Sequence, residues 1–233
     1  MYDEMAGAKG IMEVAYPAVK AVSPQTLIAQ TQMPSPSYAQ WVDITIPTIP
    51  AVDNPEAPRE YATKMRSEGK HPWFYSCVSY GITLSEVGVR DPLIPLAGYN
   101  GEAEGYLFWA LNWYKTPQPG FPITSWNEYR SLTGINECTG DGTLIYPPAH
   151  PGGTPMPSSR LKVFRDGMED YEFLHELKAL YAQKSARLTS TEQQAVLSIL
   201  DINPMMTAAW ENPELVVQRR AEAGRWIDRL AKM

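Results

Sequence analysis

The sequence predicts an α/β protein whose strands run parallel. Two observations lead to this fold class. Four short apolar runs have the length and composition of buried strands, and segments of helical periodicity separate them. Strands that alternate with helices pair in parallel, because each helix crosses back over the sheet. These observations leave two architectures open, a (β/α) barrel and a small doubly wound sheet.

The first predicted helix covers residues 11–22, where apolar residues recur with a period near 3.6. Pro17 lies inside this segment, so we expect either a kink there or a late start of the helix. The chain then predicts two short buried strands, at residues 26–32 and 42–48.

The middle of the chain predicts a second helix and two further strands. The helix follows Pro58 and ends at Gly69, which stands where a helix C-cap is expected. Residues 71–80 form an aromatic strand rich in β-formers. Residues 106–114 contain almost no polar side chain, so we expect that strand to be buried on both faces.

Residues 92–105 predict an apolar helix or turn, and a long loop is expected from Lys115 to Ser158. A loop of that length is often functional. Beyond it the chain is predicted to be helical, with Ser158 or Ser159 as the N-cap. The helix carries an apolar stripe made of Leu161, Phe164, Met168, Tyr171, Leu174 and Leu177.

Composition excludes several classes of protein. The 233 residues suit one large domain or two small ones, and the net charge of −6 gives no surface for a nucleic acid. No apolar run reaches the ~18 residues of a membrane helix, and the first residues lack the basic start and apolar stretch of a signal peptide. Cys77 and Cys138 form no CxxC pair and the histidines form no HExxH motif, so neither a metal nor a cofactor is expected.

Several segments, in this order, resemble one family: YDEM, AVKAVSPQTLIAQTQ, WVDITIP, HPWFYSCVSY, YLFWALNWY, GDGTLIYPP and PSSRLKVFRDGMEDYEFLHEL. They are similar to the catalytic region of glycoside hydrolase family 123, the β-N-acetylgalactosaminidase family, also catalogued as domain of unknown function 4091. The segment SSRLKVFRDGMEDYEFL and the preceding GDGTLIYP are the most specific part of this resemblance.

The resemblance implies the C-terminal half of a (β/α)₈ barrel of the TIM type, plus a helical C-terminal tail. Residues 1–180 would be the partial barrel, from the tip of the fourth strand to the last barrel helix. Residues 181–233 would be a helical extension that packs on it. A half barrel has two open sheet edges, so we expect poor solubility or assembly into a homodimer through those edges.

The resemblance makes Asp3 and Glu4 the catalytic pair, although the family often has a proline where this chain has Met5. Glu4 would protonate the leaving oxygen and then activate water. Asp3 would orient the substrate's 2-acetamido group, whose carbonyl oxygen is the nucleophile, and balance its positive charge. At a strand tip the backbone turns, so two adjacent carboxylates can reach different parts of one sugar.

The same resemblance implies four substrate-binding residues. Tyr75 would donate a hydrogen bond to the acetamide oxygen, Trp109 and Trp113 would form an aromatic wall for the sugar, and Asn112 would bind a hydroxyl. For each of them, ordinary core packing is the alternative. We expect Asp141 to be a turn residue. The charged residues of RDGMEDYEFL are expected to be structural ion pairs and caps: Arg165, Asp166, Glu169 and Asp170.

The predicted function is therefore a retaining, substrate-assisted exo-β-N-acetylhexosaminidase whose partner is a carbohydrate. Two alternatives stay open, a truncated non-catalytic fragment of such an enzyme and a carbohydrate-binding module. Family relatives process host or environmental glycans, so the resemblance implies export to the periplasm or beyond for a full-length parent. The residues do not discriminate galacto from gluco substrates, and they do not define the linkage.

Overall fold

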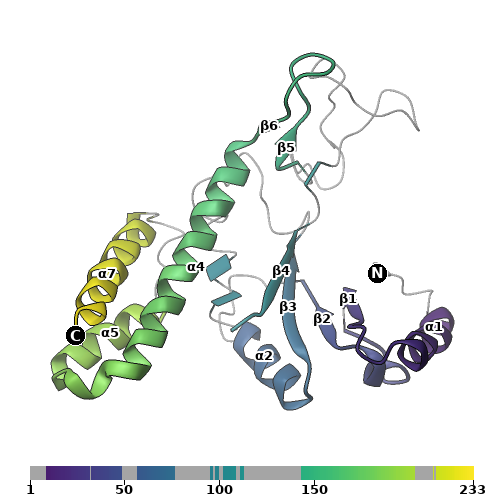
Figure 1. Cartoon of the computed structure of the whole chain (residues 1–233), viewed down its shortest axis with the longest axis horizontal. Coiled ribbons are helices and arrows are strands. Elements are labelled where there is room, and N and C mark those ends of the chain that lie inside the picture. Colours follow the sequence, from purple (N-terminus) through teal and green to yellow (C-terminus); the bar gives the residue numbers. More distant parts are fainter. Residues whose placement is uncertain are drawn as a thin grey trace.

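In the computed structural model, four parallel strands form one sheet in the order β1-β2-β3-β4 (Figure 1). They are β1 (Ala29–Thr31), β2 (Ile44–Ile46), β3 (His71–Ser76) and β4 (Gly105–Phe108). The structure describes residues 9–31, 33–48, 57–76, 95–96, 98–99, 102–108, 111–112, 143–202, 212 and 214–233. Parallel neighbours in chain order are the arrangement of a (β/α) barrel, so the predicted fold class of a partial barrel is confirmed.

All four predicted strands are present. β1 and β2 are shorter than their predicted runs, and β3 covers every described residue of its run. β4 begins at Gly105, one residue before the predicted start. The expectation that this strand is buried on both faces is wrong for Gly105–Phe108, which are half-buried. The reason is that β4 is the last strand of the sheet, and in the described part of the chain it pairs with β3 alone.

The alternation of side chains gives the sheet an outer and an inner face. On the outer face, the Phe74 ring lies 5.2 Å from the ring of Tyr61 in α2 (Ala57–Ser67). The Tyr106 ring lies 5.4 Å from Phe164 in α4 (Ser159–Lys184). The register places Tyr75 opposite Leu107, on the inner face.

Helix α1 (Lys9–Val22) covers the β1 side of the sheet, at the opposite side from α7 in Figure 1. Its Tyr16 hydroxyl donates to Gln30 Oε1 at 3.4 Å, and Gln30 Nε2 donates to the Tyr38 hydroxyl at 3.2 Å. The helix begins at Lys9 and continues through Pro17, so the alternative of a late start is wrong. Pro17 has no backbone N–H to donate to the helix, and α1 tolerates the loss of that hydrogen bond. The buried side chains of the helix are Met12 and Tyr16.

Helix α2 ends as the sequence predicts. Gly69 has a φ of 71°, the left-handed conformation that glycine adopts without strain. Its N–H donates to the Arg66 carbonyl at 2.9 Å, and the Lys70 N–H donates to the Met65 carbonyl at 2.9 Å. These two bonds form a Schellman motif, so the predicted C-cap is confirmed.

Helix α4 starts as predicted, because the Ser158 hydroxyl accepts from the Leu161 N–H at 3.1 Å. The stripe predicted for this helix is largely confirmed, with Leu174 and Leu177 buried. Met168 departs from it, since 37% of its surface is exposed. The buried face is centred on Gly167, Asp170 and Leu174, which leaves Met168 at its border.

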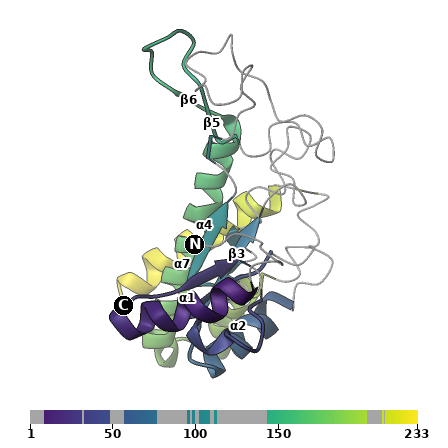
Figure 2. The ribbon, with the colours of Figure 1, turned by 90° about the vertical axis from the view of Figure 1, so that its right-hand side faces the viewer.

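The predicted loop 115–158 contains an antiparallel hairpin of β5 (Ile145–Tyr146) and β6 (Met156–Pro157). Two-residue strands among prolines have no periodicity, so the sequence pattern missed them. Figures 1 and 2 both show this hairpin at the end of the molecule where α4 begins, away from α2. The predicted turn at Asp141 lies outside the described residues.

Helices α5 (Ser190–Leu200) and α7 (Glu214–Ala231) pack against α4. Their buried side chains share one hydrophobic core with Phe74 of β3 and with Leu96. The assignment of residues 181–233 to a separate extension stays a prediction.

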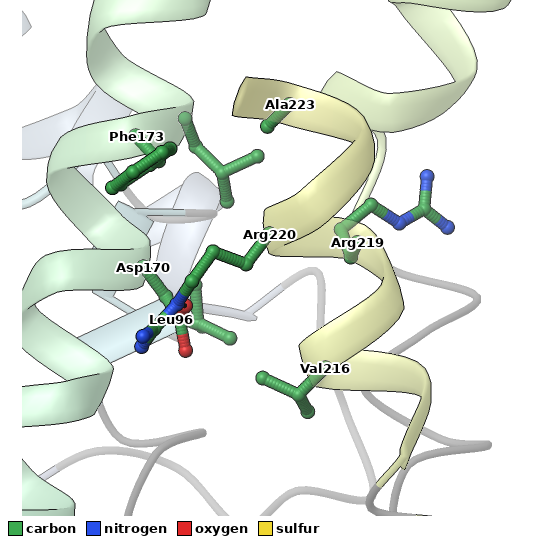
Figure 3. Close-up of a pocket in the computed structure, with 8 residues that line it drawn as sticks. Leu96, Asp170, Phe173, Val216, Arg219, Arg220 and Ala223 are labelled. Atoms are coloured by element: carbon green, nitrogen blue, oxygen red, sulfur yellow. Dashed lines mark hydrogen bonds and ion pairs between the residues drawn. The ribbon is translucent and has the colours of Figure 1, made fainter. Parts of the chain in front are cut away.

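An ion pair ties α4 to α7. Arg220 Nε donates to the Asp170 carboxylate, and Arg220 Nη2 donates to the Asp166 carbonyl at 2.6 Å. Figure 3 shows the two side chains directed toward each other across the helix contact. Arg165 Nη2 lies 2.8 Å from Asp166, and Arg165 Nε lies 3.4 Å from Glu169. The prediction of structural ion pairs in this segment is confirmed.

Gly105→Ala should destabilise the protein by about 1–3 kcal/mol, because a methyl group there would overpack the inner face. Its Cβ would clash with Cε2 and Cδ2 of the Trp73 ring. Gly10→Ala is the matched control, since no heavy atom lies within 4 Å of the added methyl. Urea unfolding of both variants measures the difference. Equal stability of the two variants would contradict the close contact.

Arg220→Met should cost about 3 kcal/mol at pH 7, because it leaves the nearly buried Asp170 carboxylate without its cation. Burial raises the pKa of Asp170, and the hydrogen bond and charge of Arg220 oppose that rise. Without Arg220 the folded-state pKa rises further above the unfolded value. A raised carboxyl pKa favours folding at low pH and loses that contribution as pH increases.

The stability deficit of Arg220→Met should therefore shrink as the pH falls from 7 to 4. Chemical unfolding at both pH values checks this expectation. Arg165→Met is the control, because Arg165 is 66% exposed in its side chain and its ion pairs lie at the surface. A deficit that is the same at both pH values would rule out the proposed linkage.

Candidate active site

The carboxyl ends of parallel strands meet at one edge of a sheet, and barrel enzymes build their sites there. In this structure β3 and β4 point toward the end of the molecule that holds the β5–β6 hairpin and the start of α4 (Figure 1). The candidate active site therefore lies at that end.

Tyr75 is fixed at this edge by its backbone. Its N–H donates to the Pro47 carbonyl at 3.0 Å, and it forms a parallel bridge with Thr48 beyond the end of β2. Three inner-face residues near the carboxyl ends of their strands are almost fully buried: Thr31 at 2%, Ile46 at 0% and Tyr75 at 3% exposure. The predicted contact of Tyr75 with substrate therefore involves a side chain that is packed in the free protein.

Asn112 lies beyond the end of β4 and is exposed. Its backbone forms an antiparallel bridge with Thr143. The N–H groups of Leu144 and Ile145 both donate to the Leu111 carbonyl at 2.9 Å. The chain that leaves β4 is thus paired with the chain that enters the β5–β6 hairpin.

Arg160, in the first turn of α4, binds the chain that enters the β5–β6 hairpin. Its Nε and Nη2 donate to the Thr143 carbonyl at 3.1 and 2.8 Å, and Nη2 also donates to the Tyr146 hydroxyl at 2.8 Å. The side chain is fully buried, with 0% exposure. Sequence reasoning missed this residue, although it lies in the segment that is most specific for the family resemblance.

The structure describes two of the six predicted site residues. Tyr75 lies on the inner face of β3, and Asn112 lies past the carboxyl end of the neighbouring strand β4. The other four are outside the described residues, and their roles stay predictions: Asp3, Glu4, Trp109 and Trp113.

A hollow in the described part of the chain lies at the opposite end of the strands. A groove of about 360 Å³ is bounded by Arg66, Glu102, Glu104 and Lys178, at the amino ends of β3 and β4. Its charges are paired, with Lys178 Nζ 2.6 Å from Glu102 and Arg66 Nη1 3.1 Å from the same carboxylate. The hydrogen bond from Lys178 lowers the pKa of Glu102. We interpret this groove as structural.

The second hollow, shown in Figure 3, lies between α4 and α7 beside Asp170 and Arg220. Its volume of about 10 Å³ is too small for a sugar. Among the described residues, no group of His, Cys, Asp and Glu has the arrangement of a metal site. No described helix is both long enough and apolar enough to span a bilayer.

A parallel sheet with Asn112 beyond its carboxyl edge has the form of a partial barrel, and comparison with known families gives the class of the protein. The chain matches the family model described as glycoside hydrolase 123, catalytic domain, over residues 3–177. It belongs to glycoside hydrolase family 123, which confirms the resemblance found in the sequence. None of the curated proteins compared with it matches. The protein is thus a glycoside hydrolase domain, and its substrate class is carbohydrate.

Proposed function

We propose that this protein is a retaining exo-β-N-acetylhexosaminidase of the β-N-acetylgalactosaminidase type. The observation that carries the proposal is the catalytic-domain match, which includes Asp3 and Glu4 and extends to Leu177 in α4. A parallel sheet of partial-barrel form, with Tyr75 and Asn112 toward its carboxyl edge, supports it.

The proposed chemistry uses the substrate's own nucleophile. Glu4 donates a proton to the glycosidic oxygen while the acetamide carbonyl oxygen attacks the anomeric carbon and displaces the aglycone. Asp3 accepts a hydrogen bond from the acetamide N–H and stabilises its developing positive charge. Glu4, now ionised, takes a proton from water, which attacks the anomeric carbon and restores the acetamide. Two inversions at the same carbon retain the anomeric configuration.

Four further side chains complete the proposed site. Tyr75 donates to the acetamide oxygen and aligns it with the anomeric carbon. Trp109 and Trp113 stack on the sugar ring, and Asn112 binds one of its hydroxyls. The alternative is a non-catalytic sugar-binding module. The observation that keeps it open is that the described part of the chain contributes four parallel strands, and a complete barrel has eight. Assembly into a homodimer through the open sheet edges is part of the same proposal.

Glu4→Gln should lower turnover of an aryl N-acetyl-β-galactosaminide by about 10²–10⁴-fold, because the amide cannot transfer the proton. Glu13→Gln, at an exposed position in α1, is the control and should keep wild-type activity. Replacing the acetamide by a trifluoroacetamide should slow the wild type steeply, since the carbonyl oxygen becomes a weaker nucleophile. Unchanged turnover in Glu4→Gln, or no effect of fluorination, would exclude this mechanism. A wild-type protein that binds the sugar without hydrolysing it would support the binding-module alternative.

Tyr75→Phe should reduce kcat/KM by about 10- to 100-fold, because one hydrogen bond to the acetamide oxygen is lost in the transition state. Tyr38→Phe is the matched control, because this buried hydroxyl accepts from Gln30 on the α1 side of the sheet. It should lower the melting temperature and leave kcat/KM unchanged. Kinetics and thermal melting of both variants separate the two effects. If Tyr75→Phe loses only stability, then Tyr75 is a core residue.

A further inference from the structure

We infer that Arg160 is a positioning residue for the carbohydrate site, because its guanidinium holds Thr143, and Thr143 holds Asn112. The consequence for sugar binding rests on the proposed function, in which Asn112 contacts a hydroxyl. The mechanical part, that Arg160 fixes the chain beyond β4, is independent of that function and is tested separately.

Arg160 is a buried cation whose hydrogen bonds all go to neutral oxygens. It donates to the Thr143 carbonyl and to the Tyr146 hydroxyl. Its Nη1 has no hydrogen-bond partner among the residues that the structure describes. Within the described part of the chain, no acidic side chain pairs with it. A buried charge that lacks a counter-charge lowers stability. Arg160 is therefore poorly explained as a residue that serves stability alone.

Its place in the helix supports the same conclusion. Ser158 caps α4, so Arg160 stands in the first turn, where the helix dipole disfavours a positive charge. That turn contains no acidic residue to offset it. A neutral side chain at this position would stabilise the first turn of α4 more than an arginine does. The arginine is explained instead by the two donors, Nε and Nη2, that it directs at one carbonyl oxygen.

The contacts lead from Arg160 to the candidate active site in two steps. Thr143, whose carbonyl accepts both donors, is itself 0% exposed and bridges to Asn112. The next two residues donate their N–H groups to the Leu111 carbonyl. Without the guanidinium, the buried Thr143 carbonyl would lose the two donors Nε and Nη2, so this segment would shift or open. Asn112 is exposed, and among the described residues this pairing holds its backbone beyond the end of β4.

Hydrogen exchange of the full chain tests the mechanical part. Arg160→Met should speed exchange of the Leu144 and Ile145 amides by about tenfold or more, while the Leu177 and Ala223 amides keep their wild-type rates. Arg165→Met is the control and should change neither group. Unchanged rates at 144 and 145, or an equal increase at every amide, would overturn the inference. If Arg160→Met does not fold, Arg160→Lys decides, because lysine keeps the charge but cannot direct two donors at one carbonyl.

Kinetics test the consequence for the substrate. Arg160→Lys and Asn112→Ala should each lower kcat/KM by about 10- to 100-fold, mainly through KM. The double variant should be within about threefold of Asn112→Ala, since both changes act through the same side chain. Losses that multiply would show that Arg160 does not act through Asn112. If the wild type has no glycosidase activity, the proposed function fails, and hydrogen exchange still decides whether Arg160 holds this segment.

Discussion

The parallel pairing of β1, β2, β3 and β4 is the constraint on which the rest of the structure depends. Parallel neighbours require a crossover, so α2 and α4 contact the sheet on its outer face, and its four strands end at the same edge. The register then divides the side chains, with Phe74 and Tyr106 directed to the helices and Tyr75 and Leu107 to the inner face. Residues from distant parts of the sequence reach one edge for this reason, and that edge is where barrel enzymes build their sites.

Helix α4 extends from this edge to the C-terminal helices. It carries two buried charged side chains, one with a partner of opposite charge and one without such a partner among the residues that the structure describes. Asp170 has its counter-charge in Arg220, which ties α4 to α7 far from the strand ends. Within the described part of the chain, the partners of Arg160, near the start of the helix, are a carbonyl, a hydroxyl and an aromatic ring, and none is a carboxylate. The paired charge is explained by packing between helices. The charge without an acidic partner lies next to the chain that carries Asn112, which is why we connect it with function.

The family assignment and the structure contribute different parts of the functional argument. The match over residues 3–177 establishes a glycoside hydrolase domain, and it reaches only part of α4. The structure adds where the described residues lie: Tyr75 is packed on the inner face, and Asn112 is exposed beyond it. A packed tyrosine has few rotamers to lose on binding, which suits a group that must align an acetamide. The proposed mechanism needs such alignment, because its nucleophile belongs to the substrate.

The sequence by itself determined the four parallel strands, the C-terminal end of α2, the start of α4, and the family, because periodicity, caps and motif spacing are local properties. It also predicted Asp170 as a structural ion pair, but not its partner Arg220, which lies 50 residues away. Only the tertiary structure decided that β4 is half-buried, that a hairpin interrupts the long loop, and that Arg160 is buried against Thr143. These features depend on which segments meet in space. A local sequence pattern does not specify these tertiary contacts, because the free energy of a buried charge depends on its neighbours after folding.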